Sequence, residues 1–140
     1  LGRRFRALKA WMTFRAFGRS GIESRVREHC RLARDLAIVI ESEPHFSLSA
    51  PVVMAVVCFR YEPPGYSEDD IDQLNEIIAE SVNATGRAYI TYTELKGRTA
   101  LRIGIGNIAT QSSHVHDVWR CIVDIAKQKG PELKSTPARY

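Results

Sequence analysis

Long hydrophobic runs and paired cysteines are what this sequence lacks. Its longest uncharged apolar run, residues 50–59, is far shorter than the ~20 residues of a membrane span, and no apolar segment follows the basic start as in a signal peptide. The three cysteines, Cys30, Cys58 and Cys121, are widely spaced and odd in number, which predicts neither a disulfide framework nor a zinc site. We therefore expect a cytoplasmic protein with buried thiols and no membrane partner.

Acidic residues are scarce at the N-terminal end. Residues 1–34 hold ten arginines and lysines but only Glu23 and Glu28 as acids, whereas the whole chain has a net charge of +4. Such a basic end is typical of a segment that meets nucleic acid, phosphate or an acidic protein surface, or of a solvated helix face. The aromatic pattern of RNA-recognition motifs is absent, so a basic nucleic-acid-binding domain is the weakest alternative and no nucleic-acid partner is predicted.

Helical periodicity fills the first forty residues. Residues 4–17 carry apolar side chains at helical spacings over a wide arc, which predicts a helix that is buried on more than one side. Gly18 is expected to end it, and Ser20 with Glu23 reads as a capping box that opens a second helix running to about Glu43. The buried stripe predicted for this second helix is Ile22, Val26, Cys30, Ala33, Ala37 and Ile40.

Strands and two further helices follow. Strands are predicted over 46–49, 52–61, 87–95 and 98–107, with a hairpin turn at Lys96-Gly97. A helix capped by Ser67 should end at Gly86, and a last helix capped by Thr110 or Ser112 should fade at Gly130-Pro131. The expected buried stripes are Ile71, Leu74, Ile78 and Val82 in the first of these helices, and Val115, Val118, Ile122 and Ile125 in the second. Gly104 and Gly106 share one strand face, which predicts a close approach of another segment.

The order of elements predicts an α+β fold at 140 residues, the size of one domain. Two N-terminal helices are followed by a small antiparallel or mixed sheet with helices on one face. We divide the chain into connecting helices over residues 1–43, a small α+β domain over 44–130 and a frayed tail over 131–140. The sequence starts with Leu1 inside a helical pattern, so we expect it to continue a longer polypeptide.

None of the polar clusters resembles a self-contained active site. His114 and His116 are two residues apart, so on a helix their rings diverge by about 200° and share one ion poorly. The acidic run 68–72 is explained by the positive end of a helix dipole, and Gly104-Ile105-Gly106 does not continue into a dinucleotide fingerprint. The residues alone therefore predict no metal site, no catalytic residue and no cofactor-binding residue.

Several segments, in order along the chain, resemble the group II pyridoxal-phosphate-dependent amino acid decarboxylases, in particular the aromatic-L-amino-acid branch and its C-terminal portion. The resemblance covers about residues 1–128. The matching segments are Gly2–Trp11, Gly21–Ala33, Val57–Arg60, Val82–Thr91, Leu101–Asn107 and His114–Trp119. The resemblance implies that this chain contains the small domain of a fold-type-I enzyme. It also implies that the whole enzyme acts as a homodimer and converts an aromatic L-amino acid to its amine and CO2.

The resemblance also implies what this stretch does not contain. In the family a lysine preceded by histidine binds pyridoxal 5'-phosphate within a large domain, and none of the five lysines here follows a histidine. The cofactor is therefore expected on a large domain upstream, and this chain alone is expected to be inactive. Gly2 and Arg3 are the implied substrate-binding residues: Gly2 would leave room for an aromatic side chain, while Arg3 would contact an acidic group, hold a mobile loop or only pair with acids of the large domain. The alternative function is a non-catalytic interaction module that retains the small-domain fold.

Overall fold

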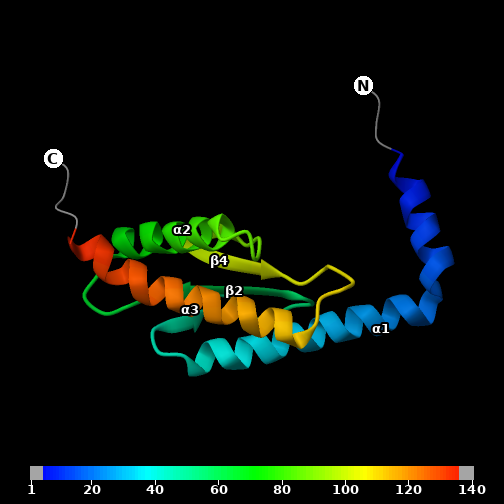
Figure 1. The fold of residues 1–140 in the computed structure, drawn as a ribbon, viewed down its shortest axis with the longest axis horizontal. Coiled ribbons are helices and arrows are strands. Elements are labelled where there is room, and N and C mark those ends of the chain that lie inside the picture. Colours follow the sequence, from blue (N-terminus) through cyan, green and yellow to red (C-terminus); the bar gives the residue numbers. More distant parts are fainter. Residues whose placement is uncertain (1–4, 136–140) are drawn as a thin grey trace.

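The computed structural model describes residues 5–135 and has the predicted α+β class. Four antiparallel strands form one sheet in the order β1-β2-β4-β3, and the helices lie together on one side of it (Figure 1). None of the helices in residues 5–135 is long and apolar enough to cross a membrane. The elements are α1 (Arg6–Ser42), β1 (Phe46–Leu48), β2 (Val56–Tyr61), α2 (Glu68–Ala84), β3 (Thr91–Leu95), β4 (Arg98–Gly104) and α3 (Ser112–Ser135).

Element α1 comprises the two predicted N-terminal helices, which meet at a kink at Gly18 as predicted. Gly18 has φ 61° and ψ 178°, a backbone conformation that is essentially restricted to glycine, and the helix resumes directly after it. The predicted capping box is not used, because Glu23 pairs instead with Arg19, whose Nε lies 2.8 Å from Oε1 of Glu23. In Figure 1 the first part of α1 projects away from the rest of the molecule beyond this kink.

Replacing Gly18 with alanine is expected to straighten α1. Alanine favours helical dihedrals by about 1 kcal/mol over glycine and avoids positive φ, while its Cβ would meet no atom within 4 Å. Spin labels on either side of the kink should therefore report a longer distance in Gly18→Ala. The control is Gly21→Ala, whose Cβ would make an ordinary contact with Phe17 at 3.4 Å and should leave the distance unchanged. An unchanged distance in Gly18→Ala would show that tertiary contacts, not Gly18, set the bend.

Two strands begin later than the sequence predicts. Residues 53–56 form a turn that is closed by a bridge between Val53 and Val56, with Met54 at φ 57°, so β2 begins at Val56. Residues 87–90 precede β3 without joining the ladder, because the side-chain amide of Asn83 bonds to both backbone groups of Ile90. The hairpin at Lys96-Gly97 is confirmed, and both residues have positive φ (54° and 74°), as a type I′ turn requires.

Strands β2 and β4 separate beyond the pair Phe59–Leu101, and side chains of α2 take over their hydrogen bonds. Asn75 is completely buried; its Oδ1 accepts from the backbone N–H of Tyr61 at 2.9 Å, and its Nδ2 donates to the Tyr61 carbonyl at 3.0 Å. Nearby, Oδ1 of Asp72 accepts from the backbone N–H of Thr99 at 2.9 Å. Helix α2 is thereby bonded to the backbone of two strands that no longer pair with each other.

Arg60 is the second buried polar residue at this junction. It is only 7% exposed, and its Nη2 lies 2.7 Å from Oδ1 of Asp72. Glu62 and Glu68 add carboxylates 3.6 Å from the same guanidinium. Three acids around one buried cation supply the charge compensation without which a buried arginine would be very unfavourable. Burying Arg60 therefore depends on α2 being in place.

Helix α2 begins at its predicted cap, whereas helix α3 extends beyond its predicted end. Ser67 caps α2 as predicted, with a complete capping box in which Asp70 is the reciprocal partner. Helix α3 does not fade at Gly130 but continues through Pro131 to Ser135, so the predicted frayed tail is wrong for residues 131–135, and residues 136–140 lie outside the described part. The Tyr66 hydroxyl donates to the Gly130 carbonyl at 2.7 Å and anchors this last stretch.

The hydrophobic core lies between the sheet and the three helices. The predicted stripe of α2 is entirely buried, whereas in α1 the burial is confined to its C-terminal part, from Leu32 to Ile40. Among the predicted positions of α1, Val26 is exposed, and Ile22 and Cys30 are half-buried. Helix α3 contributes Ile122 as predicted, and also Trp119, Val123 and Ala126. Trp119 packs edge-on against Phe46 and Phe59, with ring centroids 4.9 and 5.8 Å away, which joins α3 to the strands.

Candidate interaction surface

The first part of α1 carries a row of exposed large apolar side chains. The two sequence-predicted substrate-binding residues, Gly2 and Arg3, precede it and lie outside the described residues. Trp11 is 60% exposed and Phe14 63%, which contradicts the expectation that this helix is buried on more than one side within the chain itself. The exposed members are Phe5, Leu8, Trp11, Met12 and Phe14, and we call residues 5–17 the projecting segment. Contiguous exposed apolar area of this kind marks an interaction surface.

The projecting segment is basic as well as apolar. Its cations are Arg6, Lys9 and Arg15, and it contains no acidic residue. The guanidinium of Arg15 lies 5.8 Å from the centre of the Trp11 ring, a cation–π arrangement, so part of the positive charge is held beside the aromatic surface. A partner that covers this surface needs an apolar groove with carboxylates at its rim.

The projecting segment is connected to the loop between β4 and α3 through Arg25. The Arg25 guanidinium stacks over the Phe17 ring at 4.2 Å and donates to the Ile108 carbonyl at 3.5 Å. Ile108 lies in the loop between β4 and α3, so this contact spans α1 and the C-terminal part of the chain. The direction in which residues 5–17 leave the domain is therefore set by Gly18 and by this contact together.

The far face of the sheet carries Arg102, Cys58 and the predicted glycine pair. Arg102 is exposed and pairs in register with Cys58 on β2. A Cβ at Gly104 or Gly106 would meet nothing within 4 Å, so the predicted close approach of another segment is not made by the described residues. Burial raises the pKa of the Cys58 thiol, and the charge of Arg102 opposes that rise.

Neither the three cysteines nor the histidines His114 and His116 come together in one site. All three thiols are half-buried rather than buried as predicted, because each lies at the margin of a packed face: Cys30 on α1, Cys58 on the sheet and Cys121 on α3. His114 and His116 line different grooves, and Nδ1 of His114 accepts from the Gln111 backbone N–H at 3.2 Å. Within residues 5–135 no group of three or more His, Cys, Asp or Glu side chains is arranged to hold a metal ion.

Four of the five lysines have side chains that the structure describes, and these four do not form a Schiff-base site. Lys127 binds Glu43 at 2.9 Å and Lys129 binds Glu132 at 2.6 Å. The pKa of Lys127 is raised, mainly by its hydrogen bond to Glu43, whereas a nucleophilic lysine needs a lowered one. Lys96 lies in the hairpin turn, and Lys9 is exposed on the projecting segment. These residues do not fit the covalent site of pyridoxal phosphate.

Asn75 and the groove beside α3 were not predicted from the sequence. A signal for Asn75 was available, because it directly follows Leu74 and is adjacent to the apolar stripe of α2, where a polar residue is expected to have a backbone partner. The groove beside α3 is lined by residues from four separate segments, including Arg87, Ile103 and His114, and no local pattern links them.

Comparison with known proteins shows which family this chain resembles. The model of the pyridoxal-dependent decarboxylase conserved domain matches residues 1–62. A phenylacetaldehyde synthase of Arabidopsis thaliana is 35% identical over 126 residues, which are 90% of this chain and 26% of the relative. Tryptophan decarboxylase 2 of Oryza sativa subsp. japonica is 34% identical over 126 residues, 90% of this chain and 25% of that protein.

Solved structures agree with the sequence comparison. Oryza sativa tryptophan decarboxylase with pyridoxal phosphate and tryptamine superimposes with a TM-score of 0.81 at 30% identity, over 91% of this chain and 28% of that one. The Catharanthus roseus tryptophan decarboxylase in complex with L-tryptophan gives a TM-score of 0.78 at 31% identity, over 91% and 26%. The chain spans about a quarter of the length of the curated relatives it matches. The chain is therefore similar to pyridoxal-dependent decarboxylases, among them plant tyrosine and tryptophan decarboxylases.

Proposed function

We propose that this chain is the C-terminal part of a pyridoxal-phosphate-dependent decarboxylase that converts an aromatic L-amino acid to its amine and CO2. The observation that carries the proposal is the match over 90% of the chain to relatives that include tyrosine and tryptophan decarboxylases. The cofactor supplies the electron sink for loss of CO2 when it is bound to the rest of the enzyme. The role of this chain is to shape and support that enzyme, not to hold the cofactor.

The projecting segment is the proposed contact with the rest of the enzyme. Its exposed aromatic side chains and its cations suit an apolar groove with an acidic rim on the large domain. Covering Trp11 and Phe14 would remove a large apolar area from water, and aromatic side chains of this kind dominate the energetics of interfaces. Gly2 and Arg3, which precede this segment in the sequence, remain the proposed substrate-binding residues. The assembled enzyme is proposed to be a cytoplasmic homodimer.

A chimera tests the proposed function. The matching quarter of rice tryptophan decarboxylase 2 is replaced with this chain, and the purified protein is assayed for bound pyridoxal phosphate and for CO2 release from tryptophan, tyrosine and phenylalanine. We expect a folded chimera that retains the cofactor and decarboxylates at least one of them, with the free 140-residue chain inactive as the control. Amine and aldehyde products are both measured, because one relative is a phenylacetaldehyde synthase. A folded, cofactor-loaded chimera without turnover would instead favour a non-catalytic interaction module.

A further inference from the structure

A groove runs between the segment that follows α2 and the N-terminal half of α3. Two hollows of about 320 and 400 Å³ adjoin there and share Arg87, Ala88, His114 and Val118. A volume in this range is that of a small-molecule site. We call it the α3 groove; it lies away from the projecting segment that the proposed function uses.

Residues 87–90 form the rim of the α3 groove, and they are held in place although they belong to no strand or helix. The Asn83 side chain donates from Nδ2 to the Ile90 carbonyl at 2.8 Å and accepts at Oδ1 from the Ile90 N–H at 2.7 Å. Gly86 makes the turn out of α2 with φ 69°, which places residues 87–90 opposite α3. Backbone that is hydrogen-bonded at Ile90 in this way is preorganised, which reduces the entropic cost of binding.

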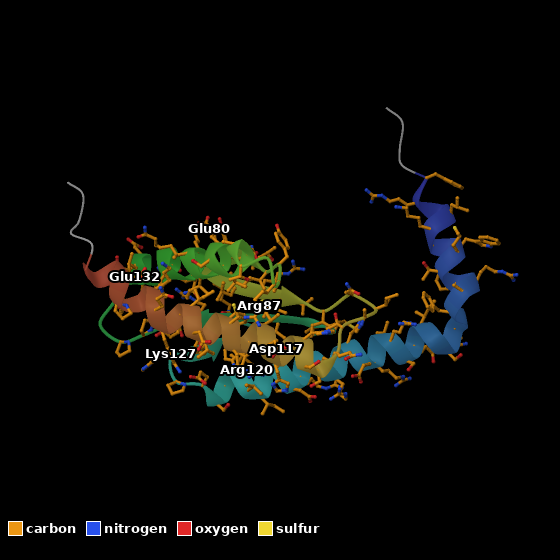
Figure 2. The ribbon with its side chains drawn as sticks, viewed as in Figure 1. Glu80, Arg87, Asp117, Arg120, Lys127 and Glu132 are labelled. Atoms are coloured by element: carbon orange, nitrogen blue, oxygen red, sulfur yellow. The ribbon has the colours of Figure 1, made fainter. Side chains whose placement is uncertain are left out.

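Opposite charges line one end of the groove and apolar side chains the remainder. Arg87 projects from the rim and Asp117 from α3, and both line the smaller hollow (Figure 2). Within the described residues the guanidinium of Arg87 has no ion-pair partner, while Asp117 accepts at Oδ1 from Arg120 at 2.9 Å. The larger hollow continues over Ile103, Ile105 and Val115. A cation, an anion and an apolar floor complement a zwitterion that carries a large apolar side chain.

We propose that the α3 groove binds a free α-amino acid with a large apolar side chain. The carboxylate of the ligand pairs with Arg87, its ammonium group with Asp117, and its side chain covers the apolar floor beyond Val118. An amine that has lost its carboxylate leaves Arg87 unpaired and binds less tightly. The choice of aromatic probes rests on the proposed function, but the binding itself does not, because it needs only the described chain.

Titration of the isotope-labelled 140-residue chain tests this site. The probes are L-phenylalanine, 2-phenylethylamine and 3-phenylpropanoate, followed by the backbone amide resonances in NMR spectra. We expect saturable shifts with L-phenylalanine at residues 87–90 and 114–118, and weaker binding of both analogues. Arg87→Gln should weaken L-phenylalanine binding about tenfold, as expected for loss of a charge-assisted pair, and should leave the affinity for 2-phenylethylamine unchanged.

Two further variants make the outcome decisive. Arg102→Gln removes the same charge from the far face of the sheet and should leave binding unchanged. Asp117→Asn should weaken binding of L-phenylalanine and of 2-phenylethylamine, and it tests the site independently if Arg87→Gln disturbs the fold. The proposal is overturned if L-phenylalanine gives no saturable shift, if the shifts lie elsewhere, or if the amine binds as tightly as the amino acid. The decarboxylase chimera is a separate protein with a separate readout, so an inactive chimera leaves this result standing.

Discussion

Replacing Asn75 with leucine is expected to lower the free energy of unfolding by about 3–5 kcal/mol. Leucine has nearly the same size, so the cost comes from the backbone N–H and carbonyl of Tyr61, both of which bond to the Asn75 amide in a fully buried place. Each buried polar group left without a partner costs about 1–3 kcal/mol. Urea denaturation followed by circular dichroism measures the difference between the variant and the natural sequence.

The matched control is Gln73→Leu on the same helix. Gln73 is exposed, so the same change from amide to leucine should alter the stability by no more than about 0.5 kcal/mol. If Asn75→Leu were as stable as Gln73→Leu, the connection between α2 and the separated ends of β2 and β4 would not depend on this side chain.

Changing Trp11 and Phe14 together to serine is expected to leave the stability of the free chain nearly unchanged but to weaken its assembly with the rest of the enzyme. The free chain should keep its stability within about 0.5 kcal/mol, because both side chains are largely exposed there. Assembly with the separately produced upstream portion of a family decarboxylase should weaken by about a hundredfold or more, since aromatic residues at the centre of an interface contribute about 2 kcal/mol or more each. Isothermal titration calorimetry of the two portions provides the affinity.

A conservative replacement of Trp11 shows whether the loss of affinity comes from lost contact area or from a change in the helix. Trp11→Phe keeps an aromatic ring and should retain most of the affinity, whereas the double serine variant should not. Equal affinities for the serine variant and the natural chain would place the contact elsewhere on the molecule and would contradict the role proposed for the projecting segment.

The sequence predicted those features of the fold that depend on local patterns. The apolar stripe of α2, its Ser67 cap and the Lys96-Gly97 turn each follow from residues within one or two turns of chain, and all are confirmed. The α+β class followed from the order of such elements. The starts of β2 and β3 were wrong because a turn at Met54 and the distant amide of Asn83 compete with strand pairing, and neither effect appears in the strand residues themselves.

Burial in α1 could not be predicted from periodicity. The apolar pattern of residues 5–17 is as regular as that of the core positions, yet only the part from Leu32 to Ile40 packs against the sheet. Hydrophobic spacing indicates that a face will be covered but does not identify what covers it. The same limit applies to the candidate sites: Arg87 and Asp117 are thirty residues apart, and only the packing of α3 beside the rim places them in one groove.

The kink at Gly18 divides α1 into two parts of different stability. Residues 32–40 share the cooperative unfolding of the domain, because they are buried in its core. The part before Gly18 has about three helical turns and no core contact, and helices of that length are marginal in water by themselves. Amide hydrogens before the kink should therefore exchange with solvent far faster than those near Leu36.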